Sequence, residues 1–107
     1  PMSVPSSIAP LALVTGATSG IGLDLAAELA RRGHRLVLVA RREAELARVA
    51  ARLEAEHGMA VAHVAMDLAA EASADRLVEA LAARGLDAVD VLVNNAGFAQ
   101  YGDFLAT

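Results

Sequence analysis

Residues 11–22 read LALVTGATSGIG, an apolar run that leads into a turn with three glycines. A helix is predicted to begin at the second of these glycines, because apolar residues recur at helical spacing from Ile21 onward. Glycines at a strand-to-helix turn let the backbone approach a pyrophosphate closely, and the free N–H groups at the helix start stabilise its charge. This stretch therefore predicts a dinucleotide-binding turn.

The glycine spacing, Gly16-x-x-x-Gly20-x-Gly22, departs from the general G-x-G-x-x-G dinucleotide pattern. Turns of this kind also occur in S-adenosylmethionine enzymes or as simple tight turns, so the motif alone leaves these interpretations open. A second motif favours the dinucleotide-binding interpretation. An apolar run that begins at Val89 is followed by Asn94-Asn95-Ala96-Gly97, a polar segment at the end of another predicted strand.

In this order and at this distance, the two motifs resemble the paired Thr-Gly-x-x-x-Gly-x-Gly and Asn-Asn-Ala-Gly signature of the short-chain dehydrogenase/reductase family. The resemblance extends from about Leu11 to the end of the sequence. It implies an NAD(P)(H)-dependent oxidoreductase scaffold. The implied partners are a nicotinamide dinucleotide and, for the parent protein, a small molecule that is interconverted between an alcohol and a carbonyl.

Short, continuously apolar strands alternate with amphipathic helices, as in a parallel sheet covered on both faces. Right-handed crossovers place the first two helices on one face, and the third on the other if the last strand returns beside the first. We therefore expect an α/β fold, a Rossmann-type doubly wound parallel sheet truncated to about four strands, in the order 3-2-1-4, with three helices. The predicted strands are Leu11–Thr15, Arg35–Ala40, Ala60–Met66 and Val89–Asn94, and the predicted helices are Gly20–Arg32, Glu43–His57 and Ser73–Arg84.

The ligand of such a sheet lies beyond the carboxyl ends of the strands where the strand order reverses. Here that place is between the first and fourth strands, so the glycine turn and the Asn94 segment are expected to converge on one crevice. Within the first helix, Ile21, Leu25 and Leu29 are spaced to form the apolar stripe that faces the sheet.

The composition fits one domain, with residues 11–107 as an incomplete dinucleotide-binding domain and residues 1–10 as an N-terminal tail that carries a cloning remnant at Pro1. A net charge of −4 argues against nucleic-acid or anionic-membrane partners. The sequence has no cysteine and no apolar run of about 18 residues, and we expect a cytoplasmic location. No metal site is expected, because the 3 histidines lie on different predicted elements.

The end of the second predicted strand bears on the choice of cofactor. NAD-binding members of such folds carry an acidic residue there for the ribose hydroxyls, whereas this sequence has Ala40-Arg41-Arg42. A small residue followed by guanidinium groups leaves room for a 2′-phosphate and offers it a bidentate partner. We therefore predict NADP(H) in preference to NAD(H), with Arg41 as the principal contact and Arg42 as a secondary one. The alternative is that both arginines are solvated residues at a helix start.

The family resemblance assigns roles to further residues. Asp67-Leu68 matches an Asp-Leu pair whose carboxylate accepts from the adenine amino group, although a turn or N-cap aspartate is the alternative. Thr15 is implied to bond towards residues 94–97. The remaining residues implied to line the crevice are Asn94, Ala96 and Gly97.

Within the glycine turn, the resemblance implies that Ile21 lends its backbone amide to the cofactor. Thr18 and Ser19 either cap the first helix or touch phosphate. The candidate residues of the turn itself are Gly16, Thr18, Ser19, Gly20, Ile21 and Gly22.

The family's catalytic set, a Tyr-x-x-x-Lys pair with an upstream Ser, is absent from this sequence. Its only tyrosine, Tyr101, is followed four positions later by Leu105, and there is no lysine. Tyr101 comes directly after the Asn-Asn-Ala-Gly motif and is interpreted as a packing residue. The sequence therefore indicates the N-terminal cofactor-binding part of an oxidoreductase, with no catalytic residue of its own.

Two other functions stay open from the sequence. One is a stand-alone, non-catalytic nucleotide-binding or redox-sensing module. The other is an S-adenosylmethionine-dependent methyltransferase, although such enzymes normally carry an acidic residue where Arg41 stands. Because a truncated sheet leaves an edge and a face uncovered, we expect the isolated chain to be marginally stable and either aggregation-prone or a homo-oligomer.

Overall fold

The computed structural model describes residues 9–18, 20–67, 73–86 and 89–93. Strands and helices alternate through these residues, and every element predicted from the sequence is present, with described boundaries within two residues of the prediction. The elements are β1 (Leu11–Thr15), α1 (Gly20–Arg31), β2 (Arg35–Ala40), α2 (Glu43–His57), β3 (Val61–Ala65), α3 (Ser73–Ala83) and β4 (Val91–Val93).

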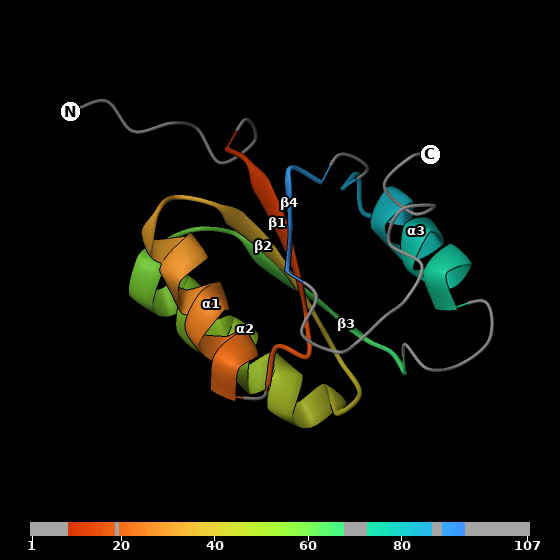
Figure 1. The fold of residues 1–107 in the computed structure, drawn as a ribbon, viewed down its shortest axis with the longest axis horizontal. Helices are drawn as coiled ribbons and strands as arrows, with labels where there is room; N and C mark the ends of the chain where they lie inside the picture. Colours follow the sequence, from red (N-terminus) through yellow and green to blue (C-terminus); the bar gives the residue numbers. More distant parts are fainter. Residues whose placement is uncertain (1–8, 19, 68–72, 87–88, 94–107) are drawn as a thin grey trace.

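The strands form one parallel sheet in the order β3-β2-β1-β4, which confirms the predicted order. Helices α1 and α2 lie on one face of this sheet, and α3 lies on the other (Figure 1). Strands β2 and β3 are thus added on one side of β1, and the chain then crosses back so that β4 pairs with the other side of β1. This arrangement brings the carboxyl end of β1 beside that of β4, with Val14 opposite Val93 in the register.

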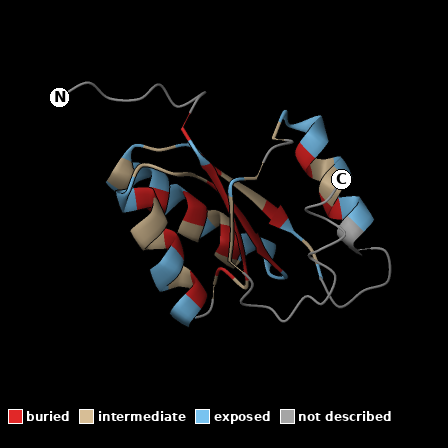
Figure 2. Ribbon diagram, turned by 45° about the horizontal axis from the view of Figure 1, so that its top comes forward, coloured by how far each residue is buried: buried red, intermediate tan, exposed pale blue. Residues whose placement is uncertain are grey.

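Two apolar layers hold the helices against the sheet, and the buried residues concentrate along the central strands (Figure 2). All five residues of β1 are buried, because they alternate between the two layers and both layers are covered. Burial of a Leu or Val side chain stabilises a fold by about 1.5–3 kcal/mol. The layer under α1 and α2 includes Val14, Leu36, Leu38, Leu46 and Leu53, and the layer under α3 includes Leu11, Leu13, Val37, Leu77 and Leu81.

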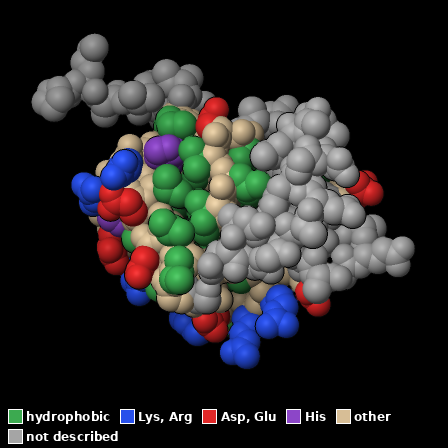
Figure 3. All heavy atoms as spheres, viewed as in Figure 1, with side chains coloured by type: hydrophobic (Ala, Val, Ile, Leu, Met, Phe, Trp, Pro, Cys, Tyr) green, Lys and Arg blue, Asp and Glu red, His purple; other side chains and the backbone are tan. Residues whose placement is uncertain are grey.

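Helix α1 differs from the prediction in the face that it buries. The buried residues are Gly22, Ala26 and Ala30, whereas Ile21 is 69% and Leu25 41% exposed. Leu29 packs half-buried against the same layer. The expected stripe is therefore wrong at Ile21 and Leu25, because small side chains let the helix approach the sheet closely and turn its larger apolar residues outward. Figure 3 shows hydrophobic side chains gathered on the face where α1 lies.

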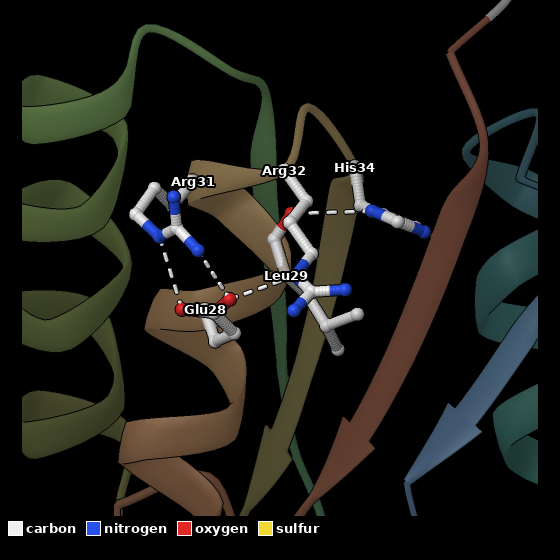
Figure 4. Close-up of polar contacts among 5 residues, drawn as sticks. All are labelled: Glu28, Leu29, Arg31, Arg32 and His34. Carbon is white, nitrogen blue, oxygen red and sulfur yellow. Dashed lines mark hydrogen bonds and ion pairs between the residues drawn. The ribbon is translucent and has the colours of Figure 1, made fainter.

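The carboxyl end of α1 carries an ion-pair network that lies away from the glycine turn (Figure 4). Glu28 accepts from Nε of Arg31 at 3.0 Å and from Nε of Arg32 at 2.7 Å. Hydrogen bonds from Arg31 and then Arg32 lower the pKa of Glu28 to about 2. His34, which follows this helix, lies with its ring Nδ1 3.2 Å from the carbonyl oxygen of Leu29. This network fixes the turn that leads into β2.

No helix within the described residues has both the length and the apolar character that a bilayer span requires.

Candidate functional site

The glycine turn after β1 contains a residue in a left-handed backbone conformation. Gly16 has a φ of 63°, a left-handed conformation that residues with a Cβ adopt at a cost of about 1–2 kcal/mol. The next amide, that of Ala17, donates to the carbonyl of Val39 at 3.3 Å. The turn is thereby anchored to the carboxyl end of β2 as well as to β1.

The two later glycines of the motif occupy different environments. Gly22 is buried on the sheet side of α1, where it allows the close helix approach described above. Gly20 is exposed at the first position of α1, and a Cβ built on it would meet no other atom within 4 Å. The packing of the described residues thus accounts for a glycine at position 22 but not for one at position 20.

The amino end of α1 differs electrostatically from those of the other helices. Its first turn holds no acidic residue, whereas α2 has Glu43 and Glu45 there and α3 has Asp75. The first N–H groups of any helix have no partner within the helix and carry its partial positive charge. Among the described residues, therefore, no carboxylate in the first turn of α1 offsets this positive charge, which favours an anion there.

Thr15 joins the end of β1 to the end of β4. Its side chain is fully buried, and its hydroxyl donates to the carbonyl of Val93 at 3.3 Å. The resemblance implied a bond towards residues 94–97, and the observed acceptor lies directly before that segment. At the opposite end of the strand, the amide of Leu11 donates to Oδ2 of Asp90 at 2.8 Å. Strand β4 is thus tied to β1 at both ends.

The carboxyl end of β2 presents two cations. Ala40 is nearly buried, at 8% exposure, and the next two residues, Arg41 and Arg42, are exposed. Nη1 of Arg42 lies 3.9 Å from Oε2 of Glu45. No ion pair to Arg41 is found among the described residues. The two arginines therefore differ, since only Arg42 faces a carboxylate.

A contact that the sequence reasoning missed lies next to these arginines. Oε1 of Glu43, the first residue of α2, lies 3.2 Å from Nε2 of His63 on β3. Both side chains line a surface hollow of about 570 Å³ along the β3 edge, together with Arg84, which directly follows α3. No sequence pattern indicated this pair, because the two residues are 20 positions apart and meet only through the pairing of β2 with β3.

The other predicted site residues are placed only in part. Asp67 is exposed just after β3, and Thr18 is half-buried in the glycine turn. The amide of Met66 donates to the carbonyl of Ala40 at 2.8 Å, which brings Asp67 to the same edge of the sheet as the arginines. Predictions on Ser19, Leu68, Asn94, Ala96, Gly97 and Tyr101 lie outside the described residues.

Comparison with known proteins identifies the family of this chain. The family model described as short chain dehydrogenase matches residues 10–107. The chain belongs to this family. One curated relative is the very-long-chain 3-oxoacyl-CoA reductase of Aspergillus clavatus. It is 41% identical to this chain over 86 residues, which cover 80% of this chain and 25% of that protein.

Solved structures of short chain dehydrogenases share the fold. L-sorbose reductase from Gluconobacter frateurii, complexed with NADPH and L-sorbose, matches with a TM-score of 0.77 and 39% identity, over 83% of this chain and 34% of that one. A short-chain dehydrogenase from Sphingobium yanoikuyae, in complex with NADPH, matches with a TM-score of 0.72 and 46% identity, over 85% of this chain and 35% of that one. The chain thus spans about a quarter to a third of the length of the relatives that it matches.

Proposed function

We propose that this chain is the N-terminal cofactor-binding part of an NADP(H)-preferring oxidoreductase that interconverts an alcohol and a carbonyl. The observation that carries the proposal is the space in front of Gly20, at the amino end of α1, where no described atom would oppose a Cβ. A ligand whose phosphates approach the backbone there accounts for the glycine. Residues 11–107 form the incomplete cofactor domain of this proposal, and residues 1–10 its tail.

The pyrophosphate is proposed to lie against the glycine turn, where Gly16 shapes the loop and the first amides of α1 donate to it. Asp67 and Leu68 are proposed to contact the adenine. When bound, the nicotinamide supplies or accepts a hydride, and the protein contributes its binding and orientation. The remaining proposed cofactor residues are Thr18, Ser19, Gly20, Ile21, Gly22, Asn94, Ala96 and Gly97.

The preference for NADP(H) is proposed to rest mainly on Arg41. Its guanidinium is exposed and has no ion pair among the described residues, so it is available to a 2′-phosphate. Arg42 already faces Glu45 and is the weaker candidate. Two of the solved relatives were obtained with NADPH, which supports this choice.

Reduction or oxidation of a substrate also needs a proton donor or acceptor. We propose that a Ser and a Tyr-x-x-x-Lys pair in a further segment of the parent protein fill this role, since the 107 residues contain no lysine. A stand-alone nucleotide-binding or redox-sensing module is the second candidate, favoured only by the same absence. Sequencing the gene past the codon for Thr107 separates the two, because a stop codon supports the module and a downstream catalytic set supports the enzyme.

Calorimetric titration of the full-length gene product with NADP⁺ and with NAD⁺ tests the cofactor. We expect tighter binding of NADP⁺, and Arg41→Ala is expected to weaken NADP⁺ binding at least tenfold, because a charge-assisted bidentate contact is worth about 1.5–3 kcal/mol. Arg42→Ala is the matched control, with a smaller effect. Preference for NAD⁺, or an unchanged ratio of dissociation constants in Arg41→Ala, contradicts the proposal.

A further inference from the structure

We propose that His63 is a positioning residue that holds the carboxylate of Glu43 away from the 2′-phosphate of NADP(H) and thereby sustains the preference for that cofactor. This inference rests on the function proposed above. It extends the cofactor site to the β3 edge strand and gives His63 a part in specificity, although His63 itself touches no cofactor atom.

Glu43 lies close to the two arginines along the chain. It follows Arg41 and Arg42 directly and opens α2, and two residues of extended chain span at most about 7 Å. A freely rotating carboxylate at this position samples the surroundings of any phosphate bound by Arg41. Like charges at such range repel each other, because they lie within the Debye length of about 10 Å.

The side chain of Glu43 is directed toward strand β3. Its carboxylate contacts His63, and in the strand register His63 lies opposite Leu38, whereas Ala65 lies opposite Ala40. Two residues along a strand correspond to about 7 Å, so the contact draws the carboxylate back from the carboxyl edge toward the middle of the sheet. The cofactor of such a fold binds beyond the carboxyl edge, and the two negative groups are thereby separated.

Other charged side chains lie near this end of α2. Glu45, the second carboxylate of the first turn, faces Arg42, and Arg84, just after α3, lines the hollow that Glu43 and His63 share. Each carboxylate of the first turn of α2 thus lies beside a basic side chain, Glu43 beside His63 and Glu45 beside Arg42. His63 is half-buried while Glu43 is 65% exposed, so the histidine is the fixed member of the pair.

The size of the effect follows from the charges. A carboxylate about 10 Å from a phosphate dianion in water, rather than about 7 Å farther away, adds enough repulsion to raise a dissociation constant about twofold. NAD⁺ lacks the 2′-phosphate and is insensitive to this repulsion. Loss of the His63 contact should therefore weaken NADP⁺ binding selectively and leave NAD⁺ binding unchanged.

The test is a double-mutant cycle on the full-length gene product, read as calorimetric dissociation constants for NADP⁺ and NAD⁺ at low salt. His63→Val keeps a strand-forming residue but removes the hydrogen-bonding ring, and we expect a roughly twofold higher dissociation constant for NADP⁺ alone. His63→Gln retains a donor and should restore the wild-type ratio. In a Glu43→Gln background, His63→Val should have no effect on the ratio.

The inference is overturned if His63→Val weakens both nucleotides equally, or if its effect persists in the Glu43→Gln background. Thermal melts of each variant report folding, and His63→Thr, a strand former whose short hydroxyl does not reach the Glu43 carboxylate in its wild-type position, replaces the valine variant if that variant does not melt cooperatively. Wild-type protein that binds neither nucleotide overturns the proposed function and this inference together. Wild-type protein that prefers NADP⁺, with His63→Val and His63→Thr keeping the wild-type ratio of the two dissociation constants, overturns only the inference.

Discussion

Substitution of Gly20 by alanine separates folding from ligand binding more sharply than any other change in the glycine turn. Within the described part of the chain, no atom outside the adjoining backbone lies within 4 Å of a Cβ built at this position, and its φ lies outside the left-handed region. Alanine is the better helix former by about 0.5–1 kcal/mol, and part of that difference applies in the first turn. We expect Gly20→Ala to raise the stability by about 0.5 kcal/mol, which corresponds to about 2–4 °C in melting temperature for a domain of this size.

The same methyl group occupies the space that the proposed pyrophosphate needs. We expect NADP⁺ binding to weaken at least tenfold, or about 1.4 kcal/mol, while the melt shifts upward. Circular dichroism melts and calorimetric titration measure the two quantities on one sample. Gly22→Ala is the control, because that glycine is buried and overpacking should cost about 1–3 kcal/mol of stability. Binding by Gly20→Ala within twofold of wild type would refute the assignment of this space to the cofactor.

Three further predictions concern the scaffold. Thr15→Val removes the hydroxyl that donates to Val93 and should lower the free energy of unfolding by about 1–2 kcal/mol, measured by urea titration. Leu36→Ala, at 1% exposure in the layer under α1 and α2, should cost on the order of 3 kcal/mol in the same assay, and a loss under about 1 kcal/mol would contradict the burial seen here. The pKa of Glu28 is lowered from 4.5 to about 2, so its contribution is present above pH 4.5 and is lost as the pH falls toward 2. Urea midpoints of wild type and Glu28→Gln should therefore differ near neutrality and converge at the acid end.

Strand order and element boundaries were predictable because the strands are continuously apolar and crossover handedness is nearly invariant. The order 3-2-1-4 needed only the sequence of strands and helices and a fourth strand that returns beside β1.

The buried face of α1 was not predicted, because hydrophobicity alone selects the largest side chains. Ile21 and Leu25 fit the helical period, yet the sheet receives Gly22, Ala26 and Ala30. Small residues four positions apart were a visible signal for close helix approach. Identifying the buried face of α1 required the distance between the helix and the sheet, which cannot be derived from a short stretch of sequence.

The pair of Glu43 and His63 was missed for a different reason. The sequence places a charged residue at the start of α2 and a histidine on β3, but only the register of β2 against β3 brings them within 3.2 Å. A register drawn from the predicted strand ends would have placed the two residues near one another. It would not have determined which way the side chain of Glu43 turns.

The bonds between β1 and β4 join residues 78 and 79 positions apart, and this separation affects how the chain is made. At a synthesis rate of about 5–20 residues per second, β1 leaves the ribosome several seconds before its second neighbour exists. One side of the first strand must therefore wait without a pairing partner, and such long-range parallel pairing is intrinsically slow to form. Substitutions in β4 should accordingly show their effects first as delayed folding and capture by chaperones during translation.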